Sequence, residues 1–282
     1  MLQSFSEEII KNIEVSKPYF ALNHLSFSDG KIHASVPKEQ PMGNELGCMA
    51  AAEAGRHLAI LGSCSLAHTN PKKEKHYYIA HKAKLTALSQ ASDCYESLHA
   101  VSRTESFNSR LGIAHATLFN RSGPIFGLEV QYHVIREKVF HKLYKSRAVE
   151  QIDSNINPYE NSFDINNIEV SGNTLKADLG PLSPEHCIGH FDVIPCLPVA
   201  VLMHALSRSA GILLSSICQS EISYRVLDAS INAENFAFAG EMVNITVEKL
   251  SHEDSDYSFR CVASGESGIT FGDMHLILSA CH

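Results

Sequence analysis

The segments FALNHLSFSDGKIHASVP (residues 20–37) and FDINNIEVSGNTLKADLG (residues 163–180) decide the fold, because one pattern occurs in both at an offset of 143 residues. In each, apolar and polar residues alternate on either side of a turn signal, Asp29-Gly30 in the first and Gly172-Asn173 in the second. This arrangement predicts a β-hairpin. The sequence therefore predicts one structural unit that occurs twice.

A second anchor supports the repeat. RSGPIFGLEV (121–130) and ESGITFGDMH (266–275) share Ser-Gly-x-x-Phe-Gly at an offset of 145. Between the anchors, each half contains one long apolar segment of helical length, at about 44–63 and about 198–217, followed by several alternating segments typical of strands. Each half is thus predicted to run hairpin, helix and sheet, which is an α+β fold.

The predicted boundary between the repeats lies at residues 148–161, where Asp, Ser, Asn and Pro cluster as in a linker. The first repeat then covers 1–147 and the second 162–282. A length of 282 residues with 44% hydrophobic and 19% charged residues suits two globular domains.

Composition excludes several classes of function. A net charge of −8 argues against nucleic-acid binding, which requires Lys and Arg to neutralise phosphates. The N-terminus has no secretory signal pattern, and charged or His residues interrupt each apolar stretch, so we expect a cytoplasmic protein that does not interact with membranes. The eight cysteines form no C-x-x-C pair and predict free thiols, with neither disulfides nor a metal site.

The segment GHFDVIPCLPVAVLMH (189–204) carries the most specific motif. It resembles the active-site segment of FabA/FabZ-type 3-hydroxyacyl-thioester dehydratases, G-H-F-P-x-x-P-x-x-P-G-x-x-x-x-[DE]. Five positions match: Gly189, His190, Phe191, Pro195 and Pro198. Three depart, because Asp192 replaces a Pro, Val199 a Gly, and His204 the catalytic carboxylate.

The resemblance implies the hotdog fold, in which a curved antiparallel sheet wraps around a long central helix. The internal repeat then implies a tandem, or double, hotdog whose two units pair within one chain, and further homodimerisation is left open. The substrate would be an acyl group on a phosphopantetheine thiol, with no cofactor, and Phe191 and Pro195 would lie beside it.

The resemblance also implies a composite active site. In the dimeric dehydratases, each site takes its His from one subunit and its carboxylate from the other. Aligning the two helical segments places Glu53 opposite His204, whereas the first half is shorter by eight residues where the second carries the His190 loop. We therefore predict one active site, from His190 and Glu53, and an inactive opposite site formed by residues 38–42 and His204.

Dehydration requires a base at the α-carbon and an acid at the β-hydroxyl, and these roles suit His190 and Glu53, respectively. Backbone N–H groups at a helix start, here Gly47 and Cys48, would stabilise the enolate-like oxygen. His57 follows Glu53 by one helical turn and could orient its carboxyl group. No metal is predicted.

A cluster of basic residues stands out in an otherwise acidic chain. It consists of Arg136, Lys138, Lys142, Lys145 and Arg147. We interpret it as a docking patch for an acidic acyl carrier protein, with acyl-CoA as the alternative substrate carrier.

The main functional prediction is a dehydratase of 3-hydroxyacyl thioesters in fatty-acid or polyketide-type biosynthesis. The first alternative is a hotdog acyl thioesterase, some of which use a helix-borne carboxylate. The second is a double-hotdog acyltransferase/decarboxylase of a polyketide pathway. A non-catalytic acyl-binding module is a further class.

Overall fold

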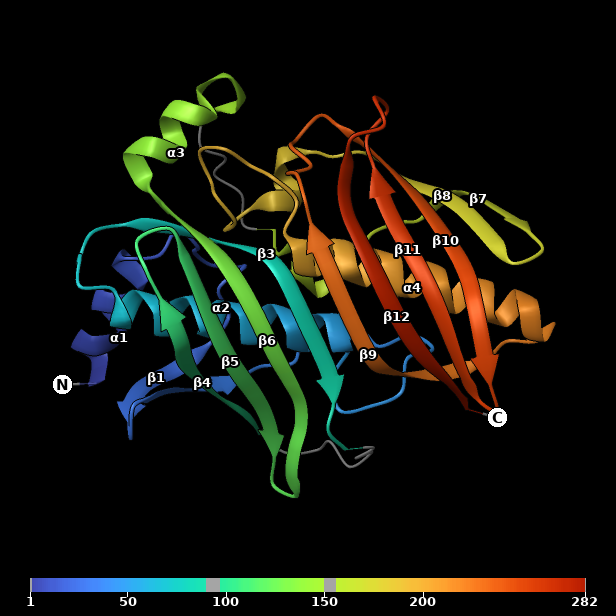
Figure 1. The fold of residues 1–282 in the computed structure, drawn as a ribbon, viewed down its shortest axis with the longest axis horizontal. Helices are drawn as coiled ribbons and strands as arrows, with labels where there is room; N and C mark the ends of the chain where they lie inside the picture. The colour runs from blue at the N-terminus through green and yellow to red at the C-terminus, as the bar shows by residue number, and fades with distance from the viewer. Residues whose placement is uncertain (1, 90–96, 150–155, 282) are drawn as a thin grey trace.

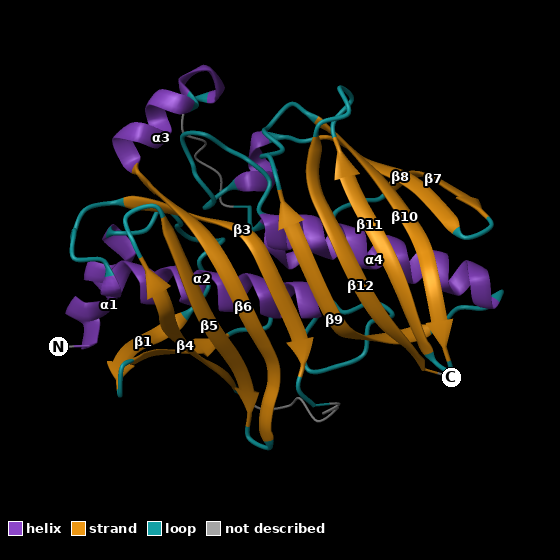
Figure 2. Cartoon of the chain, in the orientation of Figure 1, coloured by secondary structure: helices purple, strands orange, loops and turns teal. Residues whose placement is uncertain are grey.

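A computed structural model describes residues 2–89, 97–149 and 156–281. In this part of the chain, twelve strands form one antiparallel sheet (Figures 1 and 2). The strands are β1 (Asn23–Ser28), β2 (Lys31–Val36), β3 (His76–Ala87), β4 (Leu98–Phe107), β5 (Leu111–Asn120), β6 (Gly123–Arg136), β7 (Asn166–Ser171), β8 (Thr174–Pro181), β9 (Ser223–Ala233), β10 (Met242–Glu253), β11 (Asp256–Ser264) and β12 (Thr270–Cys281).

The strand order has an internal symmetry. It reads β1-β2-β4-β5-β6-β3 and then β9-β12-β11-β10-β8-β7, so the second half of the sheet is the reverse of the first with equivalent strands. The two predicted hairpins are confirmed, with Phe27 opposite Ile32 in the first and Val170 opposite Leu175 in the second. Their turns contain left-handed residues, including Gly30 at φ 72°.

The two halves are joined through β3 and β9. These strands pair over five residues, from Lys82 opposite Asn232 to Thr86 opposite Asp228. The pairing is centred on Lys84 and Ser230 and ends where β3 has a bulge between Ala80 and Lys82. A bulge bends its strand and disrupts pairing, so β3 and β9 separate beyond it.

Two long helices lie on the same side of the sheet and contact each other (Figure 2). They are α2 (Ala51–Thr69) and α4 (Val199–Cys218). Helix α4 nearly matches its predicted range, but α2 begins and ends later than the predicted 44–63. Asn70 and Pro71 end it, because a residue before proline is disfavoured in the helical conformation.

The remaining helical elements are short. They are α1 (Leu2–Lys11), α3 (Glu137–Leu143) and the 3₁₀ turns η1 (Lys145–Arg147), η2 (Pro158–Glu160) and η3 (Pro184–Cys187). Residues 150–155 of the predicted linker lie outside the described residues. The division into two domains at 148–161 therefore stays a prediction.

Helix α4 is long and apolar enough to cross a membrane by length and composition, and 67% of its most apolar window is buried inside the molecule. Helix α2 is buried over most of its length, yet it carries Glu53, Arg56 and His57 at 0–2% exposure. Charged groups are rarely buried without partners, so this cluster requires compensation, described below.

The start of α2 is held by an unexpected acid, Glu45, which is 4% exposed. Its carboxylate accepts a hydrogen bond from the N–H of Ala51 at 2.7 Å, which satisfies a first-turn donor of the helix. Burial raises the pKa of Glu45 to about 7, further raised by the nearby Glu53 and opposed by the Ala51 hydrogen bond.

The substitution Glu45→Gln should stabilise the protein at high pH. Because the folded pKa is raised from 4.5 to about 7, the wild type loses stability as pH rises through this range, whereas Gln stays neutral and still accepts from Ala51. Thermal unfolding should show the variant gaining about 1–3 kcal/mol relative to wild type between pH 5 and pH 8. An equal difference at both pH values would contradict this explanation.

Candidate functional site

The His190 loop connects η3 to α4 and is closed by Asp192. The Asp192 carboxylate accepts from the N–H of Gly189 at 2.7 Å, and the His190 N–H donates to the carbonyl of Cys187 at 2.9 Å. Gly189 and Phe191 both have positive φ, at 80° and 60°. Asp192, one of the departures from the dehydratase motif, therefore stabilises the tight turn that presents His190.

A segment from the first half of the chain holds the His190 loop in position through hydrogen bonds. We name residues 13–22 the N-terminal strap. Within it, Ser16 donates its N–H to the carbonyl of Gly189 at 2.8 Å and its hydroxyl to Asp192 at 2.9 Å. Val15 forms an isolated antiparallel bridge with His190. The position of His190 thus depends on contacts between the two halves.

The His190 ring has a defined tautomer. Its Nδ1 lies 3.0 Å from the carbonyl oxygen of Cys196, which can only accept, so Nδ1 carries the proton and Nε2 keeps a lone pair. The ring stacks on Phe191 and meets the edge of Tyr19. Burial lowers the pKa of His190 to about 4, although the Cys196 carbonyl and Asp192 raise it in part. The ring is therefore a neutral base at pH 7.

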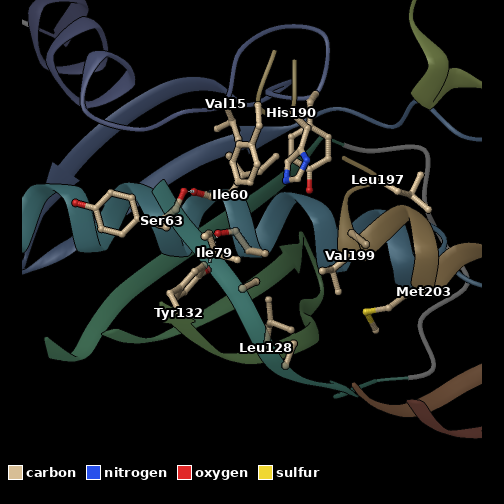
Figure 3. A pocket seen from close by; sticks show the side chains of 18 of the residues that line it. Val15, Ile60, Ser63, Ile79, Leu128, Tyr132, His190, Leu197, Val199 and Met203 are labelled. Carbon is tan, nitrogen blue, oxygen red and sulfur yellow. Dashed lines mark hydrogen bonds between the residues drawn. The ribbon is translucent and has the colours of Figure 1, made fainter. Parts of the chain in front are cut away.

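His190 lines a cavity of about 80 Å³ between α2 and α4 (Figure 3). Small residues of α2, including Gly55, Ala59 and Ser63, form one wall. Val199 and Ala200 in the first turn of α4 line another, and their N–H groups meet no acceptor among the described residues. Free N–H groups at a helix start attract negative charge, so this wall can bind an oxyanion.

A larger hollow of about 270 Å³ adjoins the cavity, and we call it the vestibule. The two share Ile79, Ala80, Val199 and Phe236. Ile79 and Ala80 lie on β3 just beyond the point where its pairing with β9 ends. The separation of the two strands therefore leads from the surface toward His190.

The structure does not bring Glu53 and His190 into contact. Glu53 accepts from the backbone N–H groups of Glu39 at 2.6 Å and Gln40 at 3.4 Å. Gly55, which lines the His190 cavity, is two residues away and so about 200° around the helix, placing Glu53 on the opposite side. No hydrogen bond or ion pair joins Glu53 to His190 in the described residues.

The helix start explains this difference. Ala50 caps α2 and Pro198 caps α4, an offset of 148, so Arg56 rather than Glu53 corresponds to His204. The sequence alignment, which places Glu53 opposite His204, is therefore shifted by three residues from the register that the helix starts give. The composite His190–Glu53 pair is thus not formed as a direct contact, and the roles of both residues stay predictions.

Arg56 balances the buried acids. Its guanidinium contacts the Glu39 carboxylate and lies 3.2 Å from His57, whose Nε2 is 3.7 Å from Glu53. Glu39, Glu53 and His57 place ligand atoms within 4.8 Å of one another, as a metal site would. The guanidinium already supplies the positive charge there, so the cluster suits an ion-pair network.

Arg56 also connects this network to the strap. Its guanidinium lies over the ring of Tyr19, whose edge meets His190, and over the ring of Tyr159. His57, predicted to orient Glu53, does lie beside it at the distance given above and is fully buried.

Other predicted site residues lie elsewhere. Gly47 and Cys48 precede the first turn of α2, whose Ala51 N–H is occupied by Glu45, and they do not line the His190 cavity. Cys48 is disulfide-bonded, contrary to the prediction of free thiols, which holds for the six other described cysteines, Cys64, Cys187, Cys196, Cys218, Cys261 and Cys281. Phe191 lines the cavity, whereas the Pro195 carbonyl accepts from Ala239.

The predicted basic patch surrounds α3. Arg136, Lys138, Lys142 and Lys145 are exposed, and Arg147 pairs with Glu241 at 2.8 Å. Phe140 of α3 packs against Tyr77 and Phe191, and Tyr144 and Arg147 line the vestibule. The patch therefore sits beside the entrance toward His190.

Sequence reasoning assigned no role in the site to Tyr19, Ser16, Arg56 or Glu45. Tyr19 and Ser16 lie in a segment with no repeat partner or motif, and only the tertiary contact gives them a role. Arg56 and Glu45 had a sequence signal, namely charged residues within or beside an apolar helical segment.

No protein-family model and no curated protein matches the chain. Solved structures match across nearly the whole length. The TesB protein of Mycobacterium avium subspecies paratuberculosis has a TM-score of 0.59 at 9% identity, covering 100% of both chains. The acyl-CoA thioesterase II TesB2 of Mycobacterium marinum has a TM-score of 0.57 at 12% identity, covering 94% of this chain and 97% of that one.

A hot dog fold protein of Alicyclobacillus acidocaldarius has a TM-score of 0.57 at 10% identity, covering 95% and 99% of the two chains. This chain has the hotdog fold. At such low identities the likeness concerns the fold alone.

The substitution Gly189→Ala should loosen the strap. A Cβ at Gly189 would lie 2.5 Å from the Ser16 carbonyl oxygen and 2.8 Å from the Tyr19 nitrogen, both backbone atoms. We expect a loss of about 1–3 kcal/mol in denaturant unfolding. Gly30→Ala is the matched control, because Gly30 has a similar φ of 72° with open space around it. Equal losses in both variants would mean that backbone strain alone, and not the strap contact, accounts for the effect.

Proposed function

We propose that the protein is an acyl-thioester hydrolase in which neutral His190 activates the attacking water. The observation that carries the proposal is one cavity lined both by His190, whose Nε2 keeps a lone pair, and by Val199 and Ala200, whose N–H groups meet no described acceptor. The likeness in fold to structures titled TesB and acyl-CoA thioesterase supports the same class of reaction.

The residues fit a general-base mechanism. Nε2 of His190 takes a proton from water as the water oxygen bonds to the thioester carbonyl carbon. The carbonyl oxygen becomes an oxyanion and accepts from the N–H groups of Val199 and Ala200, whose position at the helix start favours negative charge. As the C–S bond breaks, the protonated His190 returns the proton to the leaving thiolate. The products are a carboxylic acid and a free thiol.

Dehydration, the main prediction from the sequence, is less well supported. It requires an acid near the base, yet no Asp or Glu of the described residues lines the His190 cavity, Glu53 points to the other side of α2, and the hydroxyl of Tyr19 is only a weak acid. The motif around His190 still favours it, so enoyl formation is measured in the test below. Hydrolysis needs only one base, water and an oxyanion site.

We also propose that the chain is a tandem hotdog with one active site. The equivalent strand orders and the symmetric β3–β9 pairing support two paired units. At α4 the first-turn N–H groups are open, but at α2 the Glu45 carboxylate occupies the N–H of Ala51. At the start of α2, the Glu45 carboxylate would repel an oxyanion and already occupies the N–H group that the oxyanion would need.

Tyr19 fits a supporting role. It lines the cavity beside His190, and its hydroxyl has no partner among the described residues. Burial raises its pKa, so it remains a neutral donor. It can hold the attacking water or the thioester carbonyl in line with Nε2.

The substrate would enter through the vestibule on a phosphopantetheine arm. The cavity admits little more than the thioester group and a water, while the vestibule gives room for the arm. The exposed cations of the patch around α3 favour an acidic carrier protein docked at that entrance.

Removing His190 should abolish hydrolysis. We expect His190→Ala to lower kcat/KM for release of free thiol from acyl-CoA by about 10²–10⁴-fold, because the one histidine among the described residues that line the cavity is lost. In the wild type, kcat/KM should fall only as pH approaches 4, since the pKa of His190 is lowered to about that value and the ring stays neutral above it.

Glu53→Gln is the matched control and should leave kcat within a few-fold of wild type. Should 3-hydroxyacyl-CoA instead yield enoyl product, lost in both variants, the protein is a dehydratase. Full thiol release by His190→Ala would overturn the proposed site.

Reversing charge on the patch should weaken use of a carrier protein. We expect Lys138→Glu combined with Lys142→Glu to raise KM for an acyl group on a carrier protein about tenfold, with kcat unchanged. Hydrolysis of the uncharged acyl-N-acetylcysteamine should not change. The pair Lys31→Glu and Lys176→Glu, which alters net charge equally on distant exposed strands, is the control. Equal effects from both pairs would argue against a local docking site.

A further inference from the structure

A third hollow, which we call the α4 pocket, lies apart from the His190 cavity. Its volume is about 560 Å³, and none of its lining residues is shared with the cavity or the vestibule. It is bounded by the 41–44 loop, one face of α4 and the beginning of β9. Gly211 on α4 permits this shape, because the Tyr224 ring packs directly over it.

The pocket is related to the His190 cavity by the internal symmetry of the fold. The β3–β9 pairing is centred on Lys84 and Ser230, an offset of 146, so Tyr78 in the first cavity corresponds to Tyr224 in the second. The catalytic parts are absent, since the 41–44 loop supplies no histidine and Glu45 occupies the start of α2. The α4 pocket is thus suited to binding and not to hydrolysis.

Two side chains in the pocket have unused donors. Arg208 donates to the carbonyl of Phe163 at 2.5 Å and meets no carboxylate at ion-pair distance in the described part of the chain. His204 is 5% exposed, lines the pocket and hydrogen-bonds to no described residue. A buried polar side chain normally has a hydrogen-bond partner. Because His204 has none among the described residues, a ligand in the pocket can supply one.

The charged groups around Arg208 and His204 favour a negatively charged hydrogen-bond acceptor. Burial, with Arg208 and Arg56 nearby, lowers the pKa of His204 to about 4, although Glu53 raises it in part. Glu53 is already held by two backbone N–H groups and Glu39 by Arg56. Glu45, next to Tyr224, accepts from Ala51, and Glu221, the acid among the described residues that line the pocket, is exposed at the rim. The guanidinium of Arg208 therefore keeps an unmatched positive charge.

We propose that the α4 pocket binds a short-chain monocarboxylic acid, with the carboxylate accepting hydrogen bonds from Arg208 and His204. A planar guanidinium suits the two oxygens of a carboxylate. Pro41, Met42 and Ile212 give an apolar wall for the aliphatic tail. The acid released by thioester hydrolysis belongs to this class, but the site does not depend on that activity.

Isothermal titration calorimetry with sodium hexanoate tests the proposal. The full-length His190→Ala protein should bind one hexanoate per chain, and the neutral isostere hexanamide should bind at least about tenfold more weakly, because it lacks the charge that Arg208 recognises. Arg208→Gln in the same background should weaken hexanoate about tenfold or more, and His204→Phe several-fold. Thermal melts check that each variant is folded.

The His190→Ala background separates this proposal from the proposed hydrolase, since binding is measured without catalysis. Loss of thiol release with hexanoate binding intact would leave the α4 pocket standing. Equal affinity for hexanoate and hexanamide, no binding at all, or binding unchanged by Arg208→Gln in a folded variant would overturn it. The hexanamide comparison needs no further substitution and decides the case if a variant fails to fold.

Discussion

The short pairing of β3 with β9 is the constraint on which the rest of the structure depends. Its five-residue register makes two six-stranded halves into one sheet and fixes the position of α2 beside α4. Because the pairing ends at the β3 bulge, the strands diverge and leave the vestibule and the His190 cavity between them. A longer ladder would have closed that route.

The His190 loop shows how the two halves meet at the proposed site. Its turn is built by local residues, with Asp192 accepting from Gly189, but its position is set by Ser16, Val15 and Tyr19 from the other half. Such contacts hold a side chain in place before a reaction begins, which suits the role of base that we propose for His190. The same closeness makes a side chain at position 189 costly, because backbone atoms of the strap occupy the space.

Electrostatics makes the His190 cavity and the α4 pocket, which are related by the internal symmetry, unequal. At the start of α4 the N–H groups of Val199 and Ala200 have no described acceptor and belong to residues that line the cavity of His190, whereas at the start of α2 the N–H of Ala51 donates to Glu45. Across the two helices, Arg56 neutralises Glu39 while Arg208 keeps its charge toward the α4 pocket. The oxyanion site that we propose is therefore a helix start, whereas the anion site that we propose in the α4 pocket is made of side chains.

The sequence by itself determined the hairpins, the helix in each half and the motif residue His190, because alternation, apolar length and turn residues are local properties. It also determined that acids and bases would lie on α2. Which of them face His190 was decided only by tertiary structure. A helix start displaced from Gly47 to Ala50 rotates every later side chain, so Glu53 meets backbone N–H groups and Arg56 takes the corresponding place. The roles of Tyr19, Ser16 and Glu45 arise from contacts between segments far apart in the chain, which no local pattern encodes.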